Sequence, residues 1–494
     1  MNKYLLSIDQ STSATKAILF NTEAQLIARA NVDHGQYYPQ SGWVEHDPVE
    51  IFENTIKVIR NVISESKIDA ENVLGIAITN QRETVVVWDK STGLPVYNAI
   101  VWQCNRGAAK CDELKQKGYE SLFRKKTGLV IDPYFSATGI AWILDNISGA
   151  REKAEKGDLL FGTIDSWLIW KLTKGEVHAT DHSNACRTML YNINTRSWDT
   201  EILQILNIPA TMAPGIKYAD ETFGQTDADG SFSNPIPIAG VLGDSHGALF
   251  GQNCFAPGMG KATYGTGSSI MMNIGSQPHK SPEGLVTSIG YALRNEVSYV
   301  FEGNIHCTGA TIKWLQDDLK LIENASETEA LAQSVANTGG VYFVPAFTGL
   351  GAPYWDNTAR ALICGMTRGT TKAHVVRAAL EAIAFQVKDL IDLMTKGAGI
   401  NLKELRVDGG PVKNNFLMQF QADMLHATIN RSDIAEASAL GVALACGLAL
   451  GVYKNLEAIA KMRTNNDFIT GNMQVAKVTE LYDGWKKAVN RAMN

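Results

Sequence analysis

The sequence LLSIDQSTSATKAILF, residues 5–20, decides the fold. Apolar residues at its two ends predict two short strands joined by a tight turn, Ser11–Thr15, which is rich in hydroxyl side chains and is followed by Lys16. Backbone N–H groups, hydroxyls and a cation on one side of a turn can bind phosphate oxygens. Asp9 ends the first strand, where its carboxylate can hold Mg²⁺ directly or through water. Taken alone, the stretch is explained equally well by an ordinary hairpin with a polar turn.

A second stretch repeats this pattern half a chain later. KATYGTGSSIMMNIG, residues 261–275, places a Gly-Thr-Gly-Ser-Ser turn between two apolar runs. The chain thereby resembles the actin-like ATPases and sugar kinases, in which one such hairpin in each half binds a nucleotide held between the halves. The repeat favours phosphate binding over an ordinary hairpin at both turns.

Length and composition limit the class of protein. A chain of 494 residues is too long for one core, so we expect two large domains. A net charge of −6 argues against nucleic acid or an anionic membrane as the partner. The sequence contains no apolar run long enough to span a bilayer and starts without a signal-peptide core, so we expect no membrane insertion and a cytoplasmic location. Seven dispersed cysteines without CxxC spacing predict reduced thiols, not disulfides or a zinc site.

The order of predicted elements indicates an α/β fold. Strands dominate the start of the chain and then alternate with helices, which predicts mixed sheets flanked by helices. Asp47-Pro48 predicts a helix start, with Asp as the N-cap. A long helix is predicted over residues 373–396, with Gly397 as its C-cap. A strand over residues 235–243 leads to Asp244, which could also cap the helix that follows.

Charged and aromatic residues near predicted strand ends are candidates for binding a polyol. Arg82 can donate to hydroxyl oxygens and Glu83 can accept from hydroxyl hydrogens, although an exposed surface ion pair is an equally ordinary explanation. Trp102 and Tyr134 can cover the carbon face of a polyol, although single aromatics are more often core residues.

Eight motifs, in register from end to end, resemble those of the glycerol kinases within the FGGY carbohydrate kinases. They are SGWVEHDP (41–48), TNQRET (79–84), NAIVWQC (98–104), TGLVIDPYFSAT (127–138), LLFGTIDSWLIWKLT (159–173), PAFTGLGAPYWD (345–356), LRVDGGPVKNNFLMQFQADML (405–425) and WKKAVNRAM (485–493). The resemblance implies two actin-like (ribonuclease H-like) domains, each a mixed sheet flanked by helices, with the active site in the cleft between them. It implies residues 1–248 as the domain for acceptor and phosphate, residues 249–494 as the nucleotide domain, and a homo-dimer or homo-tetramer.

The resemblance also implies a site that uses ATP and Mg²⁺ to phosphorylate a small polyol. Asp244 is then the catalytic base, in agreement with the residue type, because an Asp of ordinary pKa is ionised at neutral pH and can take the proton of an attacking hydroxyl. The implied acceptor-binding residues are Arg82, Glu83, Trp102, Tyr134, Asp244 and Ser245. The implied nucleotide- and phosphate-binding residues are Thr12, Ser13, Ala14, Lys16, Thr266, Gly309, Lys313, Gly409, Gly410 and Asn414. The implied metal ligands are Asp9 and Asp244.

Some positions depart from the family pattern. Ser11 and Lys16 stand where glycine and arginine are usual, and we expect phosphate binding to survive both changes. Ser245 and Ser269 stand where glutamine and phenylalanine are usual, which predicts a larger and wetter acceptor pocket. Losing a buried ring costs about 1–3 kcal/mol of binding. The acceptor is therefore glycerol or, as an alternative, a tetritol (erythritol, threitol) or a pentulose (xylulose, ribulose).

Two further expectations concern regulation and class. Pro235 replaces the arginine of a loop through which fructose bisphosphate inhibits some relatives, so we expect no such inhibition. A switch ATPase of the actin or chaperone kind would explain the hairpins but not Asn80–Glu83 or the aromatics. Acceptor-dependent ADP release separates these classes, and intact Asp9 and Asp244 argue against an inactive sensor.

Overall fold

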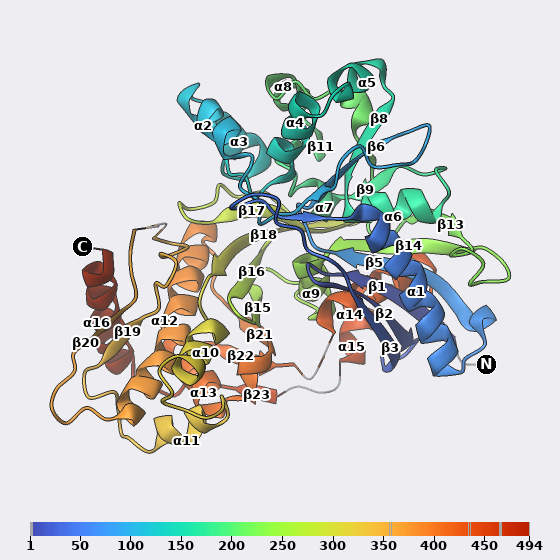
Figure 1. Cartoon of the computed structure of the whole chain (residues 1–494). Coiled ribbons are helices and arrows are strands. Elements are labelled where there is room, and N and C mark those ends of the chain that lie inside the picture. Colours follow the sequence, from blue (N-terminus) through green and yellow to red (C-terminus); the bar gives the residue numbers. More distant parts are fainter. Residues whose placement is uncertain are drawn as a thin grey trace.

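The computed structural model describes residues 3–354, 356, 358–432, 434, 436–463 and 467–493. Two large mixed sheets with flanking helices form its two halves (Figure 1), which confirms the predicted two-domain α/β fold class. The first sheet has the order β13-β14-β5-β1-β2-β3. Its strands are β1 (Tyr4–Gln10), β2 (Ala14–Asn21), β3 (Leu26–Asp33), β5 (Val73–Asn80), β13 (Thr222–Thr226) and β14 (Ile236–Gly243).

The second sheet repeats the connectivity of the first. Its order is β17-β18-β16-β15-β21-β22-β23. In each sheet an antiparallel hairpin, β1–β2 or β15–β16, has a parallel strand, β5 or β21, beside its first strand. The strands are β15 (Met259–Tyr264), β16 (Ser268–Gly275), β17 (Val286–Leu293), β18 (Glu296–Ile305), β21 (Glu404–Gly409), β22 (Thr428–Arg431) and β23 (Asp467–Ile469). The repeat in the sequence is therefore a structural repeat.

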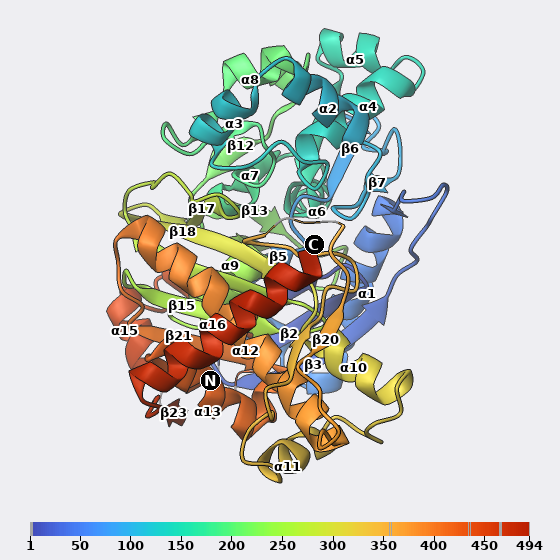
Figure 2. The same ribbon diagram turned by 90° about the vertical axis from the view of Figure 1, so that its left-hand side faces the viewer.

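A smaller four-stranded sheet, in the order β4-β7-β6-β8, belongs to the first half. Figures 1 and 2 both show helices α2–α5 and α8 gathered around it, away from the two large sheets. The strands are β4 (Glu45–His46), β6 (Val85–Asp89), β7 (Ala99–Ile100) and β8 (Leu159–Thr163). The helices are α2 (Ala108–Gln116), α3 (Glu120–Thr127), α4 (Ser136–Asn146), α5 (Ala150–Lys156) and α8 (Thr200–Ile205).

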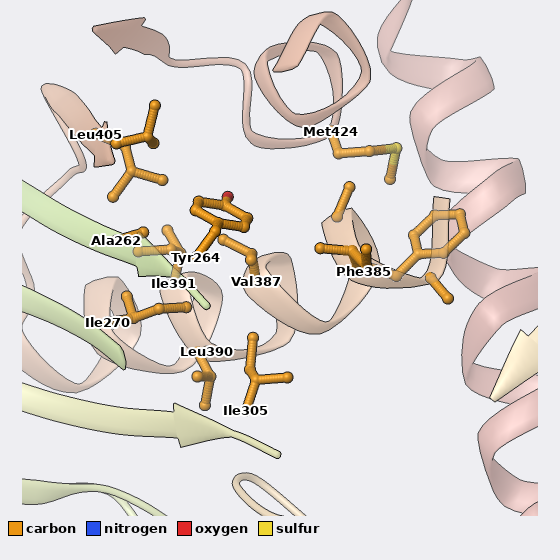
Figure 3. Packing of buried hydrophobic residues seen from close by; sticks show 14 of the residues in the cluster. Ala262, Tyr264, Ile270, Ile305, Phe385, Val387, Leu390, Ile391, Leu405 and Met424 are labelled. Carbon is orange, nitrogen blue, oxygen red and sulfur yellow. The ribbon is translucent and has the colours of Figure 1, made fainter. Parts of the chain in front are cut away.

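The core of the second half lies between its sheet and helices α12 (Lys372–Ala398) and α13 (Asn415–Leu425). Figure 3 shows Tyr264 and Ile270 of the sheet packed among Leu390 and Ile391 of α12. The C-terminal helix α16 (Val475–Met493) lies against α12 (Figure 2), where Trp485 Nε1 donates to Asp389 at 2.8 Å.

Two helices join the halves at close range. In the pair α9 (Asp244–Gly251) and α14 (Ala437–Ala449), a Cβ added to Gly441 would lie 1.9 Å from the Gly247 carbonyl oxygen. Ser7 Oγ of β1 donates to the Ala439 carbonyl of α14 at 2.8 Å. The small residues of α14 thus permit close packing against the first sheet. Among the described helices, none has both the length and the apolar character that crossing a membrane requires.

The remaining helices and strands have the following bounds. The helices are α1 (Pro48–Ser66), α6 (Ile164–Leu172), α7 (His182–Ala185), α10 (Gly309–Asp317), α11 (Glu327–Gln333) and α15 (Leu456–Met462). The strands are β9 (Ala179–Asp181), β10 (Tyr191–Asn192), β11 (Ser197–Trp198), β12 (Gly215–Lys217), β19 (Tyr342–Val344) and β20 (Leu362–Cys364). All seven cysteines are free thiols, as predicted.

The structure confirms one predicted helix cap and corrects two. Asp47 caps α1 by accepting from the Val49 and Glu50 N–H groups. Gly397 is not the C-cap of α12, because the helix continues to Ala398 and Gly399 takes the left-handed conformation with φ 65°. Asp244 is not the N-cap of α9, because Gly243 holds that position and Asp244 is the first helical residue. The predicted boundary after residue 248 falls inside α9 and stays a prediction.

Candidate active site

The turn between β1 and β2 is closed by its own backbone. Ser11 N–H donates to the Ala14 carbonyl at 2.8 Å, which leaves Thr12 and Ser13 at the tip, while Ala14 is already buried. Thr12 Oγ1 accepts from Trp102 Nε1 at 3.0 Å. The predicted phosphate turn is therefore tied to one of the predicted acceptor residues.

Strand register places Asp9 opposite Lys16 at the base of this turn. Lys16 Nζ lies 3.0 Å from Glu436 Oε2 and 3.9 Å from Asp9 Oδ2. Burial raises the pKa of Asp9 to about 7, against the opposing effect of Lys16 and with further contributions from Glu436 and Asp244. Asp9 and Asp244 thus share one electrostatic environment although they are far apart in sequence.

Asp244 is held by a buried arginine. Arg82 Nε lies 2.9 Å from Asp244 Oδ1, an ion pair without hydrogen-bond alignment, and Arg82 Nη1 lies 2.9 Å from Glu302 Oε1. Burial alone would lower the pKa of Arg82, but Glu302, Glu83 and Asp244 outweigh it and hold that pKa well above its usual value. The Asp244 side chain is 40% exposed whereas the Glu302 side chain is 1% exposed. Of the two carboxylates that Arg82 binds, Asp244 is therefore the one that can meet a substrate.

Arg82 and Glu83 do not pair with each other. Glu83 is buried, adopts φ 65° and binds Arg187 Nε at 2.6 Å, and Arg187 Nη1 also binds Glu302 at 2.8 Å. The exposed surface pair considered from the sequence is therefore wrong. The two side chains belong to a buried network of alternating charge that fixes Arg82 behind Asp244.

An aromatic wall adjoins this network. The Trp102 and Tyr134 rings meet edge to face with centroids 5.5 Å apart. The Arg187 guanidinium lies 5.8 Å from the Tyr134 ring centroid and 5.2 Å from that of Phe135. Burial raises the pKa of Tyr134, so its hydroxyl stays protonated and can donate a hydrogen bond.

Ser245 and Ser269, which replace the usual glutamine and phenylalanine of the family pattern, lie next to each other. Their Oγ atoms are 3.5 Å apart, and Lys261 Nζ donates to Ser269 Oγ at 3.4 Å and to Thr263 Oγ1 at 3.1 Å. Lys261 is buried, and this burial lowers the pKa of its ammonium group. The wall beside Asp244 is therefore polar.

A cavity of about 390 Å³ in the second half is the candidate adenosine site. Four of the predicted nucleotide residues line it, namely Gly309, Lys313, Gly410 and Asn414. Apolar residues of α12, Leu380 and Ile383, form part of the wall. Asn414 Oδ1 caps α13 by accepting from Leu417 N–H at 2.9 Å, and its amide donates to Thr328 Oγ1 at 3.0 Å.

Of the predicted nucleotide residues in the second half, Thr266 and Gly409 lie outside this lining. Gly409 has φ 103°, and a Cβ there would lie 2.0 Å from the Tyr264 carbonyl oxygen, so this glycine allows β21 to pack against the end of β15. The Thr266 carbonyl accepts from Thr308 N–H at 2.9 Å and from Ala310 N–H at 3.0 Å. The second turn is thereby fixed to the start of α10, next to Gly309.

The predicted metal ligands suit Mg²⁺. Within the described residues no group of three or more His, Cys, Asp or Glu side chains could enclose a metal ion. Two carboxylates, Asp9 and Asp244, share the region next to the first phosphate turn. Mg²⁺ is usually held by one or two carboxylates together with phosphates and water, so this donor set fits.

Sequence reasoning missed Arg187, Glu302, Glu436 and Lys261. None of them stands in a motif that marks a charge as functional. For Lys261 and Glu302, a charge inside an apolar strand was the available signal, because such a charge needs a partner when it is buried.

Two phosphate-type hairpins, a substrate-accessible carboxylate and a cavity of nucleoside size define a two-domain phosphotransferase. The chain belongs to the FGGY family of carbohydrate kinases, whose N-terminal domain model matches residues 4–251 and whose C-terminal domain model matches residues 260–450.

Full-length relatives agree with this assignment. Glycerol kinase 2 of Thermotoga maritima is 53% identical over 99% of both chains. Glycerol kinase of Bacillus subtilis is 51% identical over 100% of this chain and 99% of its own. The crystal structure of Plasmodium falciparum glycerol kinase with ADP is 38% identical, with a TM-score of 0.95 over 100% of this chain and 99% of that one.

Proposed function

We propose that this chain transfers the γ-phosphoryl group of ATP to a primary hydroxyl of glycerol and forms sn-glycerol 3-phosphate. The observation that carries the proposal is the exposed Asp244 carboxylate, which buried Arg82 and Glu302 hold in place. The relatives named glycerol kinase support the choice of acceptor.

Asp244 acts as the general base. The transition state of phosphoryl transfer is loose, so a single positioned carboxylate suffices to accept the proton of the attacking hydroxyl. Glu302 and Arg187 keep Arg82 charged and fixed, and Arg82 keeps the Asp244 carboxylate in place. Arg82, Glu83, Trp102, Tyr134 and Ser245 surround the acceptor.

The two turns bind the triphosphate. Lys16 contributes positive charge, and Thr12, Ser13, Ala14 and Thr266 contribute hydroxyl or backbone donors. Asp9 and Asp244 would hold Mg²⁺, which neutralises charge on the phosphates. Closure of the two domains over the cleft would exclude water and so limit ATP hydrolysis. Gly309, Lys313, Gly410 and Asn414 line the adenosine cavity, and Gly409 keeps its glycine turn in place.

Asp244→Asn tests this mechanism. We expect glycerol-dependent ADP release to fall about a thousandfold, because the amide cannot accept the proton. ADP should still bind, as measured by calorimetry, since the adenosine cavity is unchanged. Asp229→Asn is the matched control, because the Asp229 side chain is 69% exposed and pairs with Arg60.

Two results would contradict the proposal. Undiminished turnover in Asp244→Asn would exclude Asp244 as the base. A wild-type enzyme that releases ADP at the same rate with and without any polyol would instead be a nucleotide-switch ATPase.

A second candidate acceptor is a tetritol or a pentulose. The polar wall formed by Ser245, Ser269 and Lys261 favours it, because these side chains can bind a hydroxyl beyond those of a triol. kcat/KM across glycerol, erythritol, threitol, xylulose and ribulose decides between the candidates. We expect the double variant Ser245→Gln/Ser269→Phe to shift preference toward glycerol about tenfold. Glycerol winning by a wide margin in the wild type would exclude the larger acceptors.

Assembly, location and regulation complete the proposal. We propose that the chain forms a homo-dimer or homo-tetramer in the cytoplasm. We also propose that fructose bisphosphate does not inhibit it, since Pro235 stands where the effector loop would need arginine. Light scattering should give a molar mass of two or four times the 53.8 kDa of one chain. Inhibition by micromolar bisphosphate would contradict the last point.

A further inference from the structure

A cavity of about 1050 Å³ lies where the two halves meet, between the β2–β3 hairpin and helices α14 and α15. It shares none of its described lining residues with the adenosine cavity. Elements from both halves contribute to it, so a ligand there would contact both domains at once. Nothing in the proposed reaction uses this cavity.

The lining is mostly apolar. The apolar side chains are Phe20, Leu26, Ile434, Leu440, Leu444, Val452, Ile459 and Met462. Two lining residues, Tyr453 and Asn253, are more than nine-tenths buried, yet Tyr453 Oη and Asn253 Oδ1 have no hydrogen-bond partner. Buried polar atoms in folded proteins are normally paired, so these two unpaired atoms distinguish this wall from an ordinary apolar core.

A cation lies at the edge of this apolar lining. The Arg29 side chain is 64% exposed and, within the described part of the chain, has one ionic partner, Glu436, at a long 3.4 Å. A guanidinium carries five N–H donors, so most of the donors of Arg29 remain available. A carboxylate can bind two of these donors side by side.

We propose that this cavity binds a monoanionic amphiphile, a molecule with an apolar body and one carboxylate. The apolar body packs between α14 and α15, and the carboxylate pairs with Arg29. A neutral molecule would leave Arg29 without this pair.

The cavity is connected to the phosphate turn through Glu436. Glu436 lines the cavity, and its other carboxylate oxygen binds Lys16 at 3.0 Å. A ligand that occupies Arg29 takes a partner from Glu436, whose negative charge then acts more fully on Lys16. The attraction of Lys16 for phosphate is weakened, so the ligand raises KM for MgATP.

Calorimetry with octanoate, octan-1-ol and octylamine as probes tests the binding site without relying on catalysis. We expect octanoate to bind about tenfold more tightly than octan-1-ol, since a charge-assisted hydrogen bond is stronger than one between neutral groups. Octylamine probes the two acidic lining residues, Glu23 and Glu436, and should not bind more tightly than octanoate. Arg29→Gln should remove the preference for octanoate and leave octan-1-ol binding unchanged. Ala458→Trp, on the α15 wall, should block all three probes.

Arg60→Gln is the matched control, because the Arg60 side chain is 53% exposed and, among the described residues, has one ionic partner, Asp229. Octanoate should bind this variant as it binds the wild type. No saturable octanoate binding to the wild type, undiminished binding to Ala458→Trp, or equal affinity for octan-1-ol would overturn the proposed site. Bound octanoate that leaves KM for MgATP unchanged would overturn the connection to Lys16, while the kinase activity itself stays independently measurable.

Discussion

The two hairpins have the same connectivity but differ in the side chains at their bases and in how their turns are fixed. The β1–β2 hairpin places charged side chains at its base, where Asp9 faces Lys16 across the strands. The β15–β16 hairpin pairs Thr263 with Ser269 at the corresponding place, and its turn is fixed to α10 by backbone hydrogen bonds. In the proposed function, the first hairpin therefore supplies charged side chains toward the metal and phosphates, and the second supplies a backbone-fixed turn.

The difference follows from what surrounds each turn. The first turn lies next to Asp244 and Glu436, where charges can be balanced against one another. The second turn is crowded, because a Cβ added to Gly267 would lie 2.3 Å from the Ile305 carbonyl oxygen. The first hairpin thus has an acid–base pair at its base, whereas the second has the buried Lys261 bound to hydroxyl groups at that place and a closely packed turn.

Of the changes that distinguish the two hairpins, Asp9→Asn should cause the largest loss of catalytic activity. We expect kcat/KM for glycerol to fall about a thousandfold, because a carboxylate placed to hold the metal becomes a neutral amide. Thr263→Val makes the corresponding change on the second hairpin and should cost less than about tenfold, the loss of one hydrogen bond. Steady-state kinetics of both variants measure the contrast, and equal losses would show that the hairpins do not differ in this way.

Gly267→Ala should lower the stability of the fold and leave the charges of the site unchanged. The added methyl group meets backbone that cannot move freely, so we expect the free energy of unfolding to fall by about 1–3 kcal/mol. Gly265→Ala is the control in the same turn, because its Cβ would lie 3.5 Å from the nearest atom, an ordinary contact. Urea unfolding with an unchanged m-value measures both. Equal stability of the two variants would contradict the crowding argument.

Local patterns in the sequence were sufficient to predict the hairpins and the Asp47 cap. Each of these depends on a few adjacent residues, so spacing alone indicates it. The end of α12 was misplaced because Gly397 and Gly399 both suit a C-cap, and only the folded helix shows which one takes positive φ.

The network behind Asp244 could not be predicted in the same way. Arg82, Arg187 and Glu302 lie on three elements separated by more than a hundred residues, and only packing of the two halves brings them together. Glu436 lies at the start of an apolar helix whose composition indicates core. The family resemblance named the residues proposed to contact substrates and left out those that hold Arg82 in place.

The smallest expected effect is a pH dependence of stability that arises from the first hairpin. Folding raises the pKa of Asp9 from its usual 3.8 to about 7, so the folded chain keeps a proton that the unfolded chain has released. Stability should therefore fall as pH rises through this interval and level off above it. In buffer free of nucleotide and magnesium, Tm measured between these pH values should fall less steeply in Asp9→Asn than in the wild type, because the amide does not titrate. The second hairpin has no carboxylate at the matching position. The difference between the wild-type and Asp9→Asn slopes therefore reports the contribution of the β1–β2 hairpin. Identical slopes would mean that Asp9 is ionised in the folded chain throughout, and that Lys16 outweighs its burial.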